Sequence, residues 1–334
     1  MAFLNRAGDV NIDNRLCLVT FLRGNEEVTK AFTDLAEELT TSFGNISSVI
    51  FLERPKSGPT VFPENCEQII LPGTKYQRIL QLLSTRREEY FLLVDNDMLI
   101  HTDNVLSFVR KMFMGGYDIG WGKIAAVQRT GLVPEMVYID KVLSHAIIRP
   151  FLWKMNIGIS IPGQCLMFRG GAFAGKLPQR DTFLDDLALG LHIRVNYREF
   201  KILYLKDVLG FEHPSESWQI LCSQRCRWAK GYAAICISAW RTREIFFVAV
   251  HGLSYHANWL LHWAILILFY TIHPLLAVGY FGAVLAIMTC GRVRMLPSAT
   301  LYNLFFPILH CQWFLALLNE FRTRNSTFSE RNNN

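Results

Sequence analysis

The sequence predicts an α/β fold followed by a helical module in a membrane, and two observations predict it. In the first two thirds of the chain, apolar runs typical of strands alternate with amphipathic runs typical of helices. Farther on, residues 245–291 and 295–319 contain no Asp, Glu, Lys or Arg. Each run exceeds the roughly 20 apolar residues that a membrane span needs. The protein is therefore not expected to be wholly soluble.

The elements of the first part follow a regular order. Strands are expected at residues 16–22, 47–53, 68–71, 90–94, 163–169 and 200–205, with helices at 28–43, at 75–83 and from residue 185. Alternation of this kind implies a mostly parallel sheet with helices on both faces. Ligands of such sheets bind beyond the carboxyl ends of the strands, where Asn25, Glu26 and Glu53 fall. These three residues are therefore candidates for contacts to a nucleotide.

Two aspartates, Asp95 and Asp97, come directly after the strand at 90–94. Side chains alternate along an extended chain, so both carboxylates lie on the same side. Such a pair offers hard oxygen ligands to Mg²⁺ or Mn²⁺, and the metal in turn can bridge the oxygens of a diphosphate. D-x-D alone is common in solvated turns, but the apolar strand before it and the motifs after it favour a metal site here.

Two further motifs follow in order. Asp185 and Asp186 open an apolar helix, where one of them can act as a general base or both can simply stabilise the helix N-terminus. Gln224, Arg227 and Trp228 stand at i, i+3 and i+4, and therefore share one helix face. An amide, a cation and a flat ring suit an anionic leaving group and the apolar face of a sugar. The alternative is an amphipathic helix with a core Trp and a solvated Arg.

In these residues the chain resembles the membrane-bound family 2 glycosyltransferases, which include chitin, hyaluronan, cellulose and poly-N-acetylglucosamine synthases and ceramide glucosyltransferase. The resemblance runs from about Leu16 to Gly231 and includes F-E-H-P at 211–214 ahead of Q-R-C-R-W. It implies a Rossmann-like GT-A catalytic domain, which we place at residues 10–235. It also implies a hexosyltransferase (EC 2.4.1 type) that moves sugar from a UDP-sugar with inversion.

The resemblance assigns roles to the motif residues. It places Asp95 near the nucleotide and Asp97 on Mg²⁺ or Mn²⁺, and it makes Asp186, beside Asp185, the general base. The helix residues Gln224, Arg227 and Trp228 match contacts to the diphosphate and the acceptor. Lys75 falls near a lysine that faces the donor, although Arg86 or Arg87 could do the same work.

Two departures from the family pattern concern the donor and the membrane. The family usually has Asp-Asp or Asp-Gly after the second strand to hold the uracil, whereas this chain has Glu53 in F-L-E-R-P. The longer side chain of Glu53 can accept the same N–H from the base, but it leaves the identity of the base open. No span is expected before the catalytic domain.

Composition favours a cytosolic catalytic domain at a membrane. The formal net charge of +6 suits contact with anionic lipid head groups and a nucleoside diphosphate. The eight cysteines are scattered without a C-x-x-C pair, and scattered cysteines are typical of reduced thiols. No signal peptide is expected in the first ten residues, and nucleic acid is not an expected partner.

The last third is expected to form a membrane module. We predict an interfacial helix at residues 236–250 and two to three transmembrane helices at 251–320, followed by a disordered tail at 321–334. The candidate spans are 253–272, 275–290 and 300–318, and His273-Pro274 divides the first two. The sequence thus predicts an integral membrane protein, with a homo-oligomer as one possible state.

These observations favour transfer of sugar to a growing β-linked glycan at the membrane. Two alternatives stay open at this point: transfer of a single sugar to a lipid acceptor, and a membrane scaffold that has lost catalysis, of which Glu53 would be the first sign. The sequence does not name the sugar, because the contacts that select it are spread over loops without a spacing rule.

Overall fold

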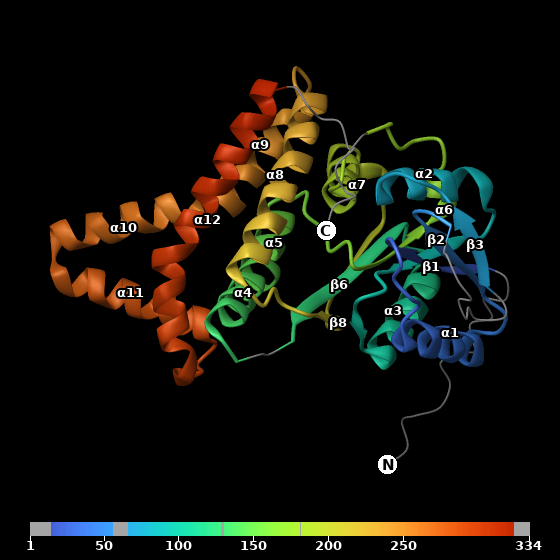
Figure 1. The fold of residues 1–334 in the computed structure, drawn as a ribbon, viewed down its shortest axis with the longest axis horizontal. Helices are drawn as coiled ribbons and strands as arrows, with labels where there is room; N and C mark the ends of the chain where they lie inside the picture. The colour runs from blue at the N-terminus through green and yellow to red at the C-terminus, as the bar shows by residue number, and fades with distance from the viewer. Residues whose placement is uncertain (1–14, 56–65, 128–129, 181, 324–334) are drawn as a thin grey trace, which may run out of the picture. The chain divides into compact units, whose positions relative to one another are not determined.

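The computed structural model describes residues 15–55, 66–127, 130–180 and 182–323. Its contacts divide the chain into two compact units, which Figure 1 shows with their element labels. The sheet unit comprises residues 1–124, 161–179 and 196–212, and the helical unit comprises residues 125–160, 180–195 and 213–334. We describe each unit by itself.

Among the described residues, the sheet unit holds an eight-stranded mixed sheet in the order β3-β2-β1-β4-β7-β6-β8-β5. Its strands are β1 (Leu16–Leu22), β2 (Ser47–Leu52), β3 (Cys66–Ile70), β4 (Tyr90–Val94), β5 (Leu99–Ile100), β6 (Ile119–Ala126), β7 (Cys165–Arg169) and β8 (Ile202–Glu212). β1 pairs in parallel with β2 and β4, and β2 does so with β3, whereas β7 is antiparallel to β4 and β6. The expected parallel sheet is confirmed for the first four strands and becomes mixed beyond them.

Helices cover both faces of this sheet, which explains why β1 and β4 are buried along their whole length. The helices of the sheet unit are α1 (Lys30–Phe43), α2 (Lys75–Thr85), α3 (Thr102–Gly115) and the short α6 (Gly170–Phe173). Phe32, Leu35 and Leu39 of α1 recur at helical spacing and pack in one core with alternate residues of β1, such as Leu16 and Leu18. Figure 1 shows α2 on the face of the sheet opposite to α1 and α3.

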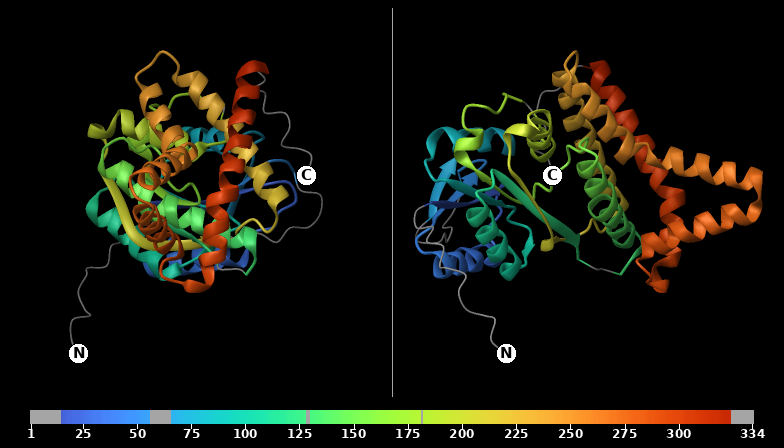
Figure 2. Two further views of the ribbon diagram at one scale, coloured as in Figure 1. Left: turned by 90° about the vertical axis from the view of Figure 1, so that its left-hand side faces the viewer. Right: turned by 180° about the vertical axis from the view of Figure 1, so that it is seen from behind.

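The helical unit is built around the long helix α12 (Leu296–Thr323), which packs along α8 (Trp218–Ala239). The other helices are α4 (Leu132–Val142), α5 (Arg149–Lys154), α7 (Asp185–Val195), α9 (Glu244–His256), α10 (Asn258–Ile272) and α11 (Pro274–Thr289). Phe306, Leu309 and Trp313 lie on the buried face of α12 at helical spacing. The views in Figure 2 show α10 and α11 as a hairpin attached to this bundle.

The structure corrects the expected interfacial helix at residues 236–250. α8 ends at Ala239 and α9 begins at Glu244, so the segment is a helix end, a turn and a helix start. Arg241 breaks the helix because its φ of 67° is left-handed, a conformation that no helix continues through. The Thr242 hydroxyl then accepts a hydrogen bond from the N–H of Glu244, the first residue of α9, at 3.2 Å.

One helix among the described residues, Val293–Thr323, is long and apolar enough to cross a membrane, where two to three spans were expected. α10 and α11 have 15 and 16 residues. At 1.5 Å per residue each is about 22–24 Å long, short of the roughly 30 Å of hydrocarbon in a bilayer. The division at His273-Pro274 lies where it was expected. The helix α12 includes the first three residues of the expected tail, and residues 324–334 lie outside the described part of the chain.

Candidate functional site

The end of β4 delivers Asp95 and Asp97 to the carboxyl edge of the parallel strands. Between them, Asn96 is buried and its Oδ1 accepts a hydrogen bond from the Thr29 N–H at 2.9 Å. Its Nδ2 donates to the carbonyl oxygen of Glu27 at 2.8 Å. Asn96 thus ties the loop between β1 and α1 to the end of β4. The sequence patterns did not indicate this structural role, which depends on the neighbouring strand.

Lys75 lies beside the first aspartate. Its Nζ is 2.6 Å from Asp95 Oδ1 and donates to the carbonyl oxygen of Gly163 at 2.7 Å. Lys75 is the first residue of α2, and Thr74 and Gln77 form a capping box that fixes the start of this helix. The structure therefore brings together Lys75 and Asp95, which the sequence placed on the same donor site.

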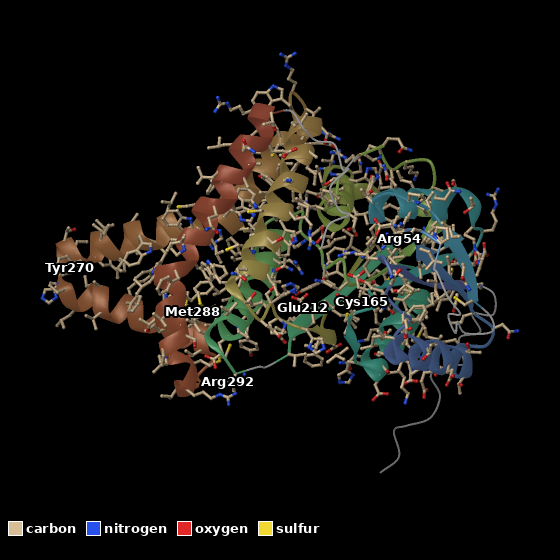
Figure 3. All side chains as sticks on the ribbon, viewed as in Figure 1. Arg54, Cys165, Glu212, Tyr270, Met288 and Arg292 are labelled. Atoms are coloured by element: carbon tan, nitrogen blue, oxygen red, sulfur yellow. The ribbon has the colours of Figure 1, made fainter. Side chains whose placement is uncertain are left out.

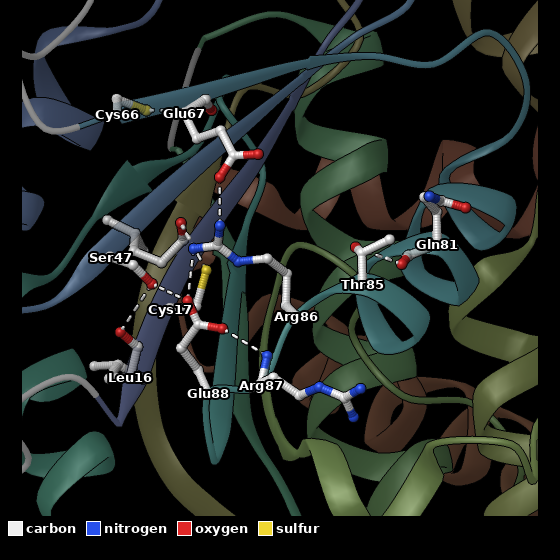
Figure 4. Close-up of polar contacts among 11 residues, drawn as sticks. Leu16, Cys17, Ser47, Cys66, Glu67, Gln81, Thr85, Arg86, Arg87 and Glu88 are labelled. Atoms are coloured by element: carbon white, nitrogen blue, oxygen red, sulfur yellow. Dashed lines mark hydrogen bonds and ion pairs between the residues drawn. The ribbon is translucent and has the colours of Figure 1, made fainter.

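Arg86 and Arg87, the alternatives to Lys75, belong to a different edge of the sheet. Arg86 Nη2 is 2.6 Å from Glu88 Oε1, which also accepts from the Ser47 hydroxyl at 2.6 Å, and Arg86 forms a second ion pair with Glu67 (Figure 4). Ser47 and Glu67 stand at the beginning of β2 and β3, the amino edge of the parallel strands. The contacts of Arg86 therefore favour Lys75 over Arg86 as the basic residue of the donor site.

The surroundings of Asp97 disfavour the negative charge of its carboxylate. Its pKa is raised above the ordinary value, first because neighbouring groups displace water and then because of the charge on Asp95, while the charge on Arg23 acts in the opposite direction. A cation at this edge would remove the repulsion between the two carboxylates. Because Lys75 already pairs with the negative charge of Asp95, a metal ion would stabilise the ionised carboxylate of Asp97 more than that of Asp95.

The donor set fits a metal ion that is shared with a ligand. Among the described residues, no group of three or more His, Cys, Asp or Glu side chains could hold a metal ion by itself. Mg²⁺ typically takes one or two carboxylates and completes its shell with water and substrate phosphates. Asp95 and Asp97 match that arrangement and do not match a metal cage made entirely of protein.

The raised pKa of Asp97 predicts how stability depends on pH without metal. The folded chain keeps this proton to a higher pH than the unfolded chain, so ionisation of Asp97 opposes folding as pH rises through the folded-state pKa. In EDTA, Asp97→Asn should therefore raise the melting temperature at pH 7. The gain should disappear below the ordinary aspartate pKa of about 3.9. A melting temperature at pH 7 that is unchanged or lower would contradict this origin of the shift.

Two residues that sequence patterns did not select also lie at this edge. The backbone carbonyl oxygen of Gln164 accepts a hydrogen bond from the Asp95 N–H at 2.8 Å. The side-chain amide of Gln164 donates to Glu212 Oε2 at 2.8 Å. Figure 3 labels Glu212 beside Cys165, the first residue of β7. The charge on Glu212 adds to the rise in the pKa of Asp97. Only the antiparallel course of β7, which the sequence did not reveal, brings Gln164 to the carboxyl edge.

The remaining donor candidates lie in turns at the ends of β1 and β2. Glu26 Oε2 accepts the Arg23 N–H at 3.0 Å, so this carboxylate closes its own turn, and Asn25 is exposed in the same turn. Glu53 is half-buried directly after β2, where its charge acts on the buried Arg78 of α2. Burial lowers the pKa of Arg78, and Glu53 partly offsets this effect. Nucleotide contacts by Asn25, Glu26 and Glu53 stay predictions.

In the helical unit, the acidic pair opens α7 as predicted. Asp185 is buried, at 8% exposed, whereas Asp186 is half-buried and more accessible. The loop before them is fixed by Thr182, whose hydroxyl accepts from the Leu184 N–H and donates to the carbonyl oxygen of Gly231, both at 3.1 Å. The loop before α7 is thereby attached to α8 at Gly231.

A glycine allows α7 to approach its support. A Cβ added at Gly190 would lie 1.8 Å from the carbonyl oxygen of Ile159, so the backbone would have to move. Gly190→Ala should therefore destabilise the fold by about 1–3 kcal/mol, measured as a lower melting temperature. Gly171→Ala is the matched control, because nothing lies within 4 Å of its added Cβ. Equal melting temperatures for the two variants would contradict the close contact.

The α8 motif presents its polar face at the helix surface. Ser217 caps the helix by accepting the Ile220 N–H at 3.3 Å. Gln224 and Trp228 are half-buried and Arg227 is exposed, on a face adjacent to the buried stripe of this helix. An amide, a cation and an indole ring are therefore accessible together.

Arg225, which the sequence patterns did not indicate as a site residue, packs its guanidinium against the Trp228 ring. Its guanidinium lies 4.5 Å from the centroid of the Trp228 ring and forms an ion pair with Asp140 of α4. Tyr302 of α12 donates to the other carboxylate oxygen of Asp140 at 3.2 Å. These contacts from three helices hold the guanidinium in place, and with it one face of the Trp228 ring.

Comparisons with known proteins find similarity in structure alone. No protein-family model matches the chain, and no curated protein matches it. A mannosyltransferase from Pyrobaculum calidifontis, solved with GDP-Man and Mn²⁺, is similar with a TM-score of 0.49 and 13% sequence identity. The match covers 95% of this chain and 91% of that one.

Glucosyl-3-phosphoglycerate synthase from Mycobacterium tuberculosis is also similar. Its structure with Mn²⁺, UDP and phosphoglyceric acid has a TM-score of 0.47 and 13% identity over 68% of this chain and 79% of that one. Its structure with Mg²⁺ and UDP has a TM-score of 0.45 and 13% identity over 67% and 79%. These neighbours are glycosyltransferases with a divalent metal ion.

Proposed function

We propose that this chain is an inverting, metal-dependent glycosyltransferase of the membrane-bound family 2 type, with a GT-A sheet domain that uses a UDP-sugar as donor. The observation that carries the proposal is the pair Asp95 and Asp97 at the carboxyl edge of the sheet, with Lys75 on one carboxylate and a raised pKa on the other. An edge of this kind suits a diphosphate and a divalent cation.

On the donor side, Asp97 would hold Mg²⁺ or Mn²⁺, with Asp95 beside it. When bound, the metal ion supplies positive charge that stabilises the diphosphate as it leaves. Lys75 holds the Asp95 carboxylate in position through the contact at 2.6 Å. Glu53, at the end of β2, would accept the N–H of the uracil, with Asn25 and Glu26 in the neighbouring turn.

On the acceptor side, Asp186 would take the proton from the acceptor hydroxyl while the oxygen of that hydroxyl attacks the anomeric carbon. The bond between that carbon and the diphosphate oxygen breaks, UDP leaves, and the configuration inverts. Asp186 suits this role better than Asp185 because Asp185 is buried. Arg227 would bind phosphate oxygens, Gln224 would bind the acceptor, and Trp228 would stack against its sugar.

We further propose that the acceptor is a growing β-linked glycan at the cytosolic face of a membrane. The Q-R-C-R-W form of the motif resembles that of the polymer synthases more than that of ceramide glucosyltransferase. All eight cysteines are free, which suits a reducing compartment. The uncharged helices at the C-terminal end suit an acceptor or product at the lipid surface.

Incubation of the purified chain with a UDP-sugar, an acceptor and Mn²⁺ tests this proposal. Release of UDP with a β-configured product, and its loss in EDTA, are expected. Binding of UDP and metal without any turnover would favour a scaffold that has lost catalysis.

Mass spectrometry of the product tests the nature of the acceptor. A ladder spaced by one sugar residue supports the polymer, whereas a single lipid-linked sugar would replace it with single transfer to a lipid.

A further inference from the structure

The hairpin of α10 and α11 is attached to the helical unit at one end only. Figures 1 and 2 show it extending from α12, and Figure 3 labels Tyr270 near its tip and Met288 at its base. Met288 is buried against the α4 and α12 core, whereas Tyr270 is 65% exposed. Its two helices contact each other more extensively than either contacts any other single element.

The exposed surface of this hairpin is apolar on both sides. Leu261, Leu268 and Ile272 of α10 and Leu275, Val278 and Ile287 of α11 are each 52–72% exposed. Exposed positions recur at spacings of three and four on each helix, so each helix exposes the face turned away from its partner. No Asp, Glu, Lys or Arg occurs between residues 245 and 291. An apolar surface of this extent marks a site of interaction.

The backbone N–H groups at the tip of the hairpin have hydrogen-bond partners within the hairpin, so the tip can enter hydrocarbon. The His273 N–H donates to the carbonyl oxygen of Phe269 at 2.8 Å, and Pro274 has no N–H. His273 Nδ1 accepts the Leu275 N–H at 3.2 Å, and the Leu276 N–H donates to the His273 carbonyl oxygen at 2.9 Å. Backbone that enters lipid must be satisfied internally in this way.

Polar side chains inside the hairpin bond to each other. His262 Nδ1 and the Tyr280 hydroxyl lie 3.0 Å apart and connect α10 to α11. At the base, Arg292 and Arg294 follow α11 within a few residues, and both are exposed. Cationic side chains at the end of an uncharged hairpin lie where phosphate head groups would meet them.

We propose that the α10–α11 hairpin inserts into one leaflet of an anionic bilayer and does not cross it. Helices of about 22–24 Å match one leaflet with its head groups, which is about half of the 40–45 Å of a whole bilayer. A second copy of the chain would cover one side of the hairpin, whereas lipid covers every exposed side. This inference does not depend on the proposed sugar transfer.

Flotation of the full chain with phosphatidylcholine vesicles containing phosphatidylglycerol tests the insertion. The wild-type chain should float, and Leu268→Arg combined with Val278→Arg should weaken binding more than about tenfold. The matched control, Ile70→Arg with Met114→Arg, adds the same charges at exposed apolar positions of the sheet unit and should float like wild type. Equal flotation of the two double variants, or no flotation of the wild-type chain, would overturn the proposal.

A variant that binds vesicles more tightly excludes misfolding as the explanation, because misfolding could account only for a loss of vesicle binding. Nothing lies within 4 Å of a Cβ added at Gly279 or Gly282. Gly279→Leu with Gly282→Leu should therefore be accommodated, and the added apolar surface should bind vesicles several-fold more tightly. Unchanged or weaker binding would contradict lipid contact. A stable dimer in solution that Leu268→Arg disrupts, without vesicle binding, would assign the surface to a second copy instead.

Labelling at the tip distinguishes insertion from crossing. In sealed vesicles, Tyr270→Cys should be protected from a membrane-impermeant maleimide on either side, with modification of residue 270 read by mass spectrometry. In detergent the same residue should react. Reaction with reagent trapped inside the vesicles would show that the hairpin crosses the bilayer, and reaction with reagent outside would show that it stays in water.

Discussion

Asp186→Asn is expected to lower the rate of sugar transfer about 10²–10⁴-fold, the usual effect of losing a general base. The amide cannot take the proton of the acceptor hydroxyl, so the step that creates the nucleophile fails. Binding of UDP and metal should be unchanged, because these contacts are assigned to Lys75, Asp95 and Asp97. Single-turnover transfer and equilibrium binding of UDP, measured on the same preparation, separate the two effects.

Asp185→Asn is the matched control for this variant. Asp185 is buried, whereas Asp186 is more accessible at the start of α7. The control should therefore keep more activity than Asp186→Asn and should show its main effect on melting temperature. If both variants bind donor normally and Asp185→Asn is the slower enzyme, the assignment of the base is reversed.

Asp97→Ala is expected to abolish metal-dependent turnover, with a loss of about 10³-fold or more. A bound divalent ion stabilises the charge of the leaving diphosphate by several kcal/mol, and each 1.36 kcal/mol is about tenfold in rate. Excess EDTA should have the same effect on the wild-type chain. Initial rates titrated with Mn²⁺ measure both, and the variant should need far more metal for any activity.

Asp34→Asn, an exposed substitution on α1, supplies a control with the same loss of one negative charge. It should leave the metal titration unchanged, because exposed charges away from the site contribute little. Full wild-type activity in excess EDTA would contradict the role of Asp97. So would a metal titration that Asp34→Asn shifts as much as Asp97→Ala does.

The local patterns of the sequence predicted the parts of the fold that depend on neighbouring residues. The helix expected at residues 28–43 is α1, whose buried face carries Phe32, Leu35 and Leu39, and the apolar run at 90–94 located the central strand β4. The order of strands beyond β4 was not predictable, because β7 returns antiparallel after a long intervening segment. Pairing over such a distance leaves no periodic signal in one sequence.

In the candidate site too, contacts between residues distant in the sequence were not predicted. Lys75 and Asp95 were selected from motif positions, and the structure brings them together. Asn96, Gln164 and Glu212 were missed because their hydrogen-bond partners lie far from them in the sequence. At the membrane end, hydropathy located the uncharged run and its division at His273-Pro274, but it did not show that the two helices have only 15 and 16 residues.

The most direct test of sugar transfer is incubation of the purified full chain with a panel of radiolabelled UDP-sugars and Mn²⁺. Parallel reactions would contain EDTA or the Asp186→Asn variant. If the chain transfers sugar as proposed, label from at least one donor should appear in a glycan or lipid product. Both EDTA and Asp186→Asn should remove that product. Donor that binds with no transfer from any sugar in the panel, or transfer that persists in EDTA, would contradict this proposal.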